Sequence, residues 1–135
     1  MILREWLELP HRFCWGGVGG DDCLMFCASW VEHVRGIDPA AEYRGKYETE
    51  EQAVAMIKKA GGMLSLVDRI ARKSGIVRTG NPQNGDIALI TARSATDMGI
   101  KEIGAIKFGH QWACLGYQGV VGCRAEFIAA WSIAP

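Results

Sequence analysis

The stretch Phe-Cys-Trp-Gly-Gly-Val-Gly-Gly-Asp-Asp-Cys-Leu-Met-Phe, residues 13–26, decides how this chain of 135 residues is expected to fold. Its glycines allow close approach of the backbone, and an aspartate such as Asp22 caps a helix well. After Cys23, apolar residues recur at steps of three and four as far as Val34, and Gly36 follows as a C-cap. The pattern predicts a helix that carries Cys23 on its first turn.

Cys23 is the candidate nucleophile of the chain. The unpaired N–H groups and the macrodipole at a helix N-terminus stabilise negative charge, so a thiol there is expected to gain thiolate character. The alternative is a buried structural cysteine, since free cysteine is among the most buried residue types. The flanking glycines and Asp22 favour the nucleophile.

Helical patterns come first in the chain and strand patterns follow. Apolar periodicity and glycine breaks predict three further helices, at residues 2–9, 49–60 and 63–73. After a dense turn signal at residues 81–86, short apolar runs predict four strands, at residues 87–90, 102–108, 112–117 and 119–124. This order is typical of an α+β fold with a small antiparallel sheet, and we expect a single domain over residues 1–135.

The balanced charge of the chain argues against nucleic acids and anionic membranes as partners. Fifteen basic side chains balance fifteen acidic ones, so the chain lacks the basic footprint of a protein that binds nucleic acid or an anionic membrane. The N-terminal residues match neither a signal peptide nor a membrane span, which predicts synthesis in the cytoplasm. No cofactor is indicated.

The five cysteines are expected to be free thiols. Their number is odd and no secretory signal accompanies them, so a disulfide framework does not fit. Zinc or an iron–sulfur cluster is the alternative, because both prefer thiolate ligands. No Cys-x2-Cys pair occurs among the five, so we expect no metal. They are Cys14, Cys23, Cys27, Cys114 and Cys123.

Two landmarks carry a resemblance to a known superfamily. The first runs from the aromatic residues Phe13 and Trp15 through glycines to the pair Asp22 and Cys23 at a helix start. The second is the turn at residues 84–86, Asn-Gly-Asp, which opens the first expected strand. By these residues the chain resembles the papain-like NlpC-type superfamily of cell-wall peptidases. The resemblance implies a papain-like fold, with N-terminal helices followed by a small antiparallel sheet or half-barrel.

One branch of that superfamily, found among bacteriophage and prophage tail genes, is similar over nearly the whole chain. The similarity rests on further blocks at residues 30–31, 36–40, 43–47, 61–62 and 130–131. It implies a tail-tip protein that is made in the host cytoplasm and carried in the virion. The partners it implies are other tail-tip or hub proteins and peptidoglycan.

The resemblance also assigns catalytic roles, in which the cysteine at the helix start is the nucleophile and a histidine on the second strand is the base. Ile103 falls where that histidine usually stands. His110 lies after the strand, about seven residues from Ile103, and this displacement of the order of 20 Å is too large for it to reach Cys23 in that register. In a second register His110 opens the strand that continues through residues 112–116 and lies beside the thiol. Both registers stay open, and the candidate catalytic residues are Cys23, His110 and Asp22.

Two functions from different classes follow. One is a cysteine peptidase that cuts peptidoglycan stem peptides during genome delivery, with an amidase or acyltransferase as a weaker variant on the same nucleophile. The other is a structural tail component that kept the papain-like scaffold and lost the chemistry, since folds outlive functions. The position of His110 relative to Cys23 distinguishes them.

Overall fold

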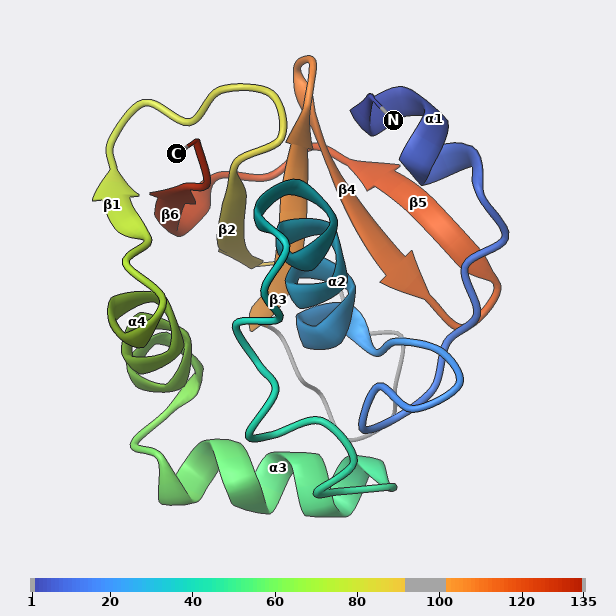
Figure 1. The fold of residues 1–135 in the computed structure, drawn as a ribbon, viewed down its shortest axis with the longest axis vertical. Helices are drawn as coiled ribbons and strands as arrows, with labels where there is room; N and C mark the ends of the chain where they lie inside the picture. Colours follow the sequence, from blue (N-terminus) through green and yellow to red (C-terminus); the bar gives the residue numbers. More distant parts are fainter. Residues whose placement is uncertain (1, 92–101, 135) are drawn as a thin grey trace.

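The computed structural model describes residues 2–91 and 102–134, in which four helices precede a six-stranded sheet (Figure 1). The helices are α1 (Leu3–Glu8), α2 (Cys23–Arg35), α3 (Glu50–Lys59) and α4 (Met63–Lys73). The strands are β1 (Val77–Thr79), β2 (Ile87–Thr91), β3 (Glu102–Phe108), β4 (Gln111–Gly116), β5 (Gly119–Cys123) and β6 (Phe127–Ser132).

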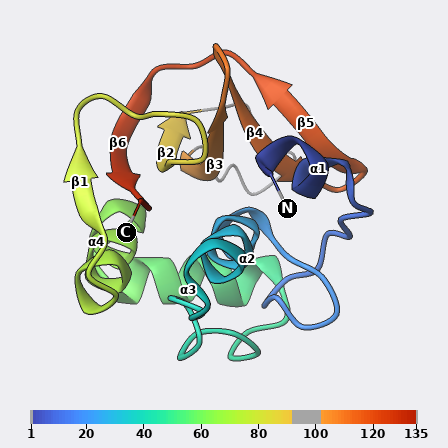
Figure 2. The same ribbon diagram turned by 45° about the horizontal axis from the view of Figure 1, so that its top comes forward.

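The sheet has the strand order β1-β6-β2-β3-β4-β5, and every neighbouring pair is antiparallel. From β2 to β5 the chain runs through consecutive neighbours, and it then crosses back so that β6 lies between β1 and β2. The sheet is curved, and α2 lies in its hollow (Figure 2). This places the first turn of α2 against the middle strands.

Local sequence explains both ends of α2. The Asp22 carboxylate accepts a hydrogen bond of 2.9 Å from the backbone N–H of Met25, which satisfies one of the unpaired donors of the first turn. At the other end Gly36 adopts the left-handed conformation, with φ of 80°, that a helix C-cap favours. Both caps match the sequence prediction.

Two buried clusters lie on opposite faces of the sheet. On the hollow side, side chains of α2 and α4 pack against alternate residues of the strands. Phe26 of α2, Leu66 of α4 and Trp131 of β6 belong to this cluster. On the outer side, Trp112, Ile90 and small side chains form the second cluster. Since successive strand residues point to opposite faces, each middle strand contributes to both clusters.

The predicted α+β class and antiparallel sheet are confirmed, and the four expected helices and four expected strands are present within a residue or two of their predicted ends. Strands β1 and β6 were not predicted. In β6 a bulge breaks the alternation of side chains between the two faces of the sheet. Leu89 and Ile90 of β2 pair with Ala129 and Phe127, which leaves Ile128 as the bulged residue. A bulged, alanine-rich strand does not show the period of two from which strands are predicted.

Candidate functional site

The first turn of α2 contacts the backbone of β3 at Gly104. A Cβ atom at position 104 would lie 2.9 Å from the carbonyl oxygen of Cys23 and 3.0 Å from Sγ of Cys27. Distances this short leave no room for a side chain, so glycine is required for this close approach. The carbonyl oxygen of the partly buried Cys23 therefore lies against the main chain of β3, and the backbone N–H of Gly104 faces its sulfur.

The Asp22 side chain is fully buried beneath the glycine-rich loop, where its carboxylate accepts three hydrogen bonds. One carboxylate oxygen accepts the Met25 N–H, and the other accepts the Gly16 N–H at 3.1 Å and the hydroxyl of Tyr47. Burial raises the pKa of Asp22, although these hydrogen bonds oppose the rise. These contacts make Asp22 the N-cap of α2 and the anchor of the loop that precedes it.

The Cys23 thiol does not have the thiolate character that its helix position predicts. Burial, followed by the negative charge of Asp22, raises the pKa of Cys23 to about 12. The backbone N–H groups of Gly104, Leu24 and Cys23 itself oppose this rise and are outweighed. Desolvation penalises the charged form more than the helix terminus favours it, so the thiol is protonated at neutral pH.

His110 lies at the far end of the β3–β4 hairpin from Cys23. The contact with α2 is at Gly104, and β3 continues four residues further, about 13 Å, before it reaches the turn that contains His110. In Figure 1 the tip of this hairpin stands at the end of α2 opposite to Cys23. The structure therefore has the first of the two registers, and the second, which brings His110 beside the thiol, is wrong.

Ile103 does not face the thiol either. Gly104 points toward α2, so the side chain of Ile103 points to the other face of the sheet, where it packs against the outer cluster. Nor do the remaining histidines reach the site. His11 hydrogen-bonds to the carbonyl oxygen of Trp6 at 2.6 Å, and His33 stacks on Trp30 with ring centres 5.7 Å apart. No histidine in residues 2–91 or 102–134 pairs with Cys23.

Arg44 also binds the glycine-rich loop, through Gly17 and Asp21, and the sequence patterns did not predict this role. Its guanidinium donates to Asp38 at 2.7 Å, to Asp21 at 3.1 Å and to the carbonyl oxygen of Gly17 at 2.9 Å. Together with Tyr47 it links the segment at residues 43–47 to the start of α2. The signal in the sequence is the presence of an arginine and a tyrosine in one short segment downstream of two adjacent aspartates.

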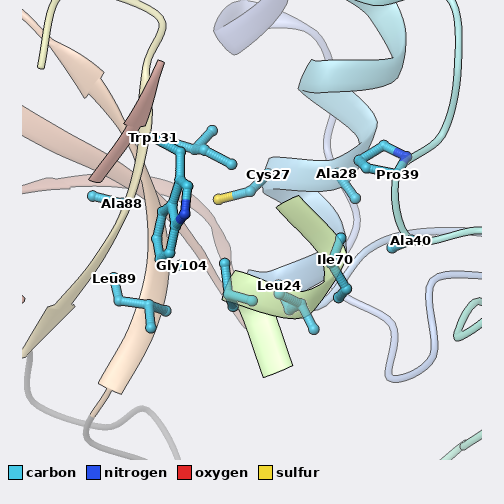
Figure 3. A pocket seen from close by; sticks show the side chains of 12 residues that line it. Leu24, Cys27, Ala28, Pro39, Ala40, Ile70, Ala88, Leu89, Gly104 and Trp131 are labelled. Atoms are coloured by element: carbon cyan, nitrogen blue, oxygen red, sulfur yellow. The ribbon is translucent and has the colours of Figure 1, made fainter. Parts of the chain in front are cut away.

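The cavity behind the first turn of α2 is apolar and small. It lies between α2, α4 and the sheet, with Leu24, Cys27, Ile70 and Trp131 among its lining residues, and the sulfur of Cys27 points toward Trp131 (Figure 3). Its volume is about 30 Å³, which is too small for an amino-acid residue of a substrate. This space is a packing gap of the core and no substrate site.

The cysteines do not assemble a metal centre in the part of the chain that the structure describes, where no group of three potential ligands is close enough together. All five thiols are free. The sulfur atoms of Cys114 and Cys123 lie 3.9 Å apart on the neighbouring strands β4 and β5.

A protein-family model described as a domain of unknown function, DUF6950, matches residues 4–133. No curated protein and no solved structure matches the chain. In the described residues no helix has the length and apolar character needed to cross a membrane.

Proposed function

The chain belongs to the DUF6950 family, and we propose that it is a papain-like domain of NlpC type that has lost peptidase chemistry and serves as a structural component of a bacteriophage tail tip. The landmarks around Trp15, Cys23 and Asp86 support the relationship to papain-like peptidases. The order of elements agrees with it, because a helix that begins with a cysteine packs in the hollow of an antiparallel sheet that follows it in the chain.

One observation carries the loss of chemistry: β3 meets the first turn of α2 at Gly104, whose backbone N–H faces the thiol, and the base that a cysteine nucleophile needs is absent from that contact. A cysteine peptidase requires a general base within hydrogen-bond reach, about 2.6–3.2 Å. His110 is a strand length away, and the pKa of Cys23 is raised to about 12. A protonated thiol without a base does not attack an amide.

The second candidate is an active peptidase, or a related amidase or acyltransferase, with Cys23 as nucleophile. Its support is the set of backbone N–H groups, from Gly104 and Leu24, that face the sulfur at the start of a helix. Such donors stabilise a thiolate once it forms. This candidate requires a base from outside the described contacts.

Digestion of peptidoglycan tests the two candidates directly. The purified full chain is incubated with sacculi, and soluble stem peptides and new amino groups are measured for the wild type, for Cys23→Ala and for Cys14→Ala as a matched thiol control. We expect equal background release from all three. Release that is lost in Cys23→Ala and kept in Cys14→Ala would establish the peptidase instead.

The structural role is tested in virions. Particles of a phage that encodes the chain are purified, and cross-linked peptides are identified by mass spectrometry. We expect the chain in the particle, with cross-links to tail-tip or hub proteins. Its absence from intact particles would refute the structural role, whatever the digestion assay gives.

A further inference from the structure

Cys114 and Cys123 form a dithiol on the β4–β5 hairpin. In the register of this pair Cys114 stands opposite Val121, and Trp112 stands opposite Cys123, so the two cysteines are diagonal neighbours on one face of the sheet. Their sulfur atoms are 3.9 Å apart and both thiols are free. Since Leu115 packs in the core with α2, Cys114 points to the outer face of the sheet, whereas α2 and Cys23 lie on the hollow side. The two sites are neighbours through the sheet, because the charge of Cys23 contributes, after burial and Cys123, to the raised pKa of Cys114.

The two thiols differ in access. β5 is an edge strand, and Cys123 is partly exposed on it, whereas Cys114 is buried among Trp112 and the small side chains of the outer cluster. A reagent from solution therefore meets Cys123 first. Cys114 lies directly behind it, which is the arrangement of an entry thiol and a resolving thiol.

We propose that this pair is a redox modification site, which closes to a Cys114–Cys123 disulfide when the chain meets a low-molecular-weight disulfide such as oxidised glutathione. The thiolate of Cys123 attacks one sulfur of the reagent, which forms a mixed disulfide and releases one small thiol. Burial raises the pKa of Cys114, so the second step is the slower one: Cys114 attacks the sulfur of Cys123 and its proton passes to the departing small thiolate, which leaves as the second small thiol. Two protein thiols are oxidised, and one small disulfide is reduced to two thiols.

The geometry makes the bond reversible. The sulfur atoms must approach from 3.9 Å to about 2.05 Å, which rotation of the side chains supplies in part. Diagonal neighbours on antiparallel strands have Cα atoms about 7–8 Å apart, beyond the usual span of a disulfide, so the strands must also shift. A bond formed under such strain is more easily reduced than a structural disulfide. The disulfide, when closed, fastens the edge strand β5 to β4.

The test treats the folded full chain with oxidised glutathione, blocks remaining thiols with an alkylating agent and maps the products by mass spectrometry. The wild type is expected to lose two hydrogens and to give a peptide linked between Cys114 and Cys123. Cys114→Ser is expected to retain glutathione on Cys123, because the resolving thiol is gone. Cys123→Ser is expected to leave Cys114 unmodified.

Two results would overturn the proposal. One is a wild type that retains glutathione on Cys123 as Cys114→Ser does; the other is a linkage between Cys114 and Cys123 that appears only in urea. The wild-type comparison with and without urea decides the question even if a serine variant fails to fold. A reductant added at the end is expected to restore both thiols in the wild type.

Discussion

The hydroxyl of Tyr47 donates a hydrogen bond to the buried carboxylate of Asp22, 25 residues earlier in the chain. The same carboxylate caps α2 through Met25 and accepts the N–H of Gly16, so one side chain joins the glycine-rich loop, the helix start and the segment at residues 43–47. Because these contacts fix where α2 begins, they also fix the position of Cys23 against β3. Buried hydrogen bonds to Asp22 thus position the backbone around the Cys23 thiol.

Tyr47→Phe is expected to destabilise the fold by about 1–3 kcal/mol, because it removes a donor from a buried carboxylate that cannot find water in its place. Urea unfolding followed by tryptophan fluorescence measures the loss. Tyr43→Phe is the matched control, since it removes a hydroxyl from the same segment and leaves the hydrogen bonds of Asp22 in place. Equal stability of the two variants would contradict the role given to Tyr47.

Alkylation of Cys23 in the folded chain is expected to be about a thousandfold slower at pH 8 than in the chain unfolded in urea. The pKa of the thiol is about 12 when folded and close to 9 when unfolded, and the alkylation rate follows the fraction of thiolate. Iodoacetamide labelling with peptide mapping gives the two rates. A folded-state rate equal to or above the unfolded one would reveal an activated thiolate and would favour the peptidase.

Gly104→Ala is expected to cost about 1–3 kcal/mol of stability, because its Cβ would overlap the Cys23 carbonyl oxygen and Sγ of Cys27. Gly80→Ala is the control. A Cβ at position 80 meets no atom within 4 Å, and no left-handed backbone is involved, so its effect is expected to stay within about 0.5 kcal/mol. Thermal and urea unfolding compare the two variants. If Gly104→Ala is as stable as Gly80→Ala, β3 does not press on α2 as described.

Sequence patterns predict the elements of this fold well where the determinants are local. Asp22 and Gly36 mark the ends of α2 because capping depends on a few adjacent residues. The strand at β3 has the predicted bounds for the same reason. In contrast, β6 is stabilised by pairing with β1 and β2, which are distant in sequence, and its bulge at Ile128 hides the alternation.

The site was predictable in its position and not in its chemistry. The glycines and Asp22 locate the start of the helix, but the pKa of Cys23 depends on what packs over it, and no pattern near Cys23 contains that information. Two registers for His110 fitted the sequence equally, because the choice depends on which strand meets α2. The contact between Gly104 and Cys23 determines the register, and these two residues are far apart in the sequence.

The pKa of Asp22 makes a specific pH dependence testable. Burial raises this pKa above the ordinary value of 3.8, so just above pH 3.8 the folded chain binds more protons at this carboxyl than the unfolded chain does. The free energy of unfolding therefore receives a contribution from Asp22 that falls as pH rises through this window. Asp22→Asn removes the titration and retains a good N-cap residue.

The difference in unfolding free energy between the wild type and Asp22→Asn is accordingly expected to shift in favour of the wild type as pH is lowered from 7 toward 4. Urea unfolding of both chains across this range gives the difference, and Glu126→Gln, at an exposed carboxylate, is the control. If the wild type instead loses stability relative to Asp22→Asn on acidification, the hydrogen bonds from Tyr47, Met25 and Gly16 outweigh burial. The ionised carboxylate would then be the form that the fold prefers.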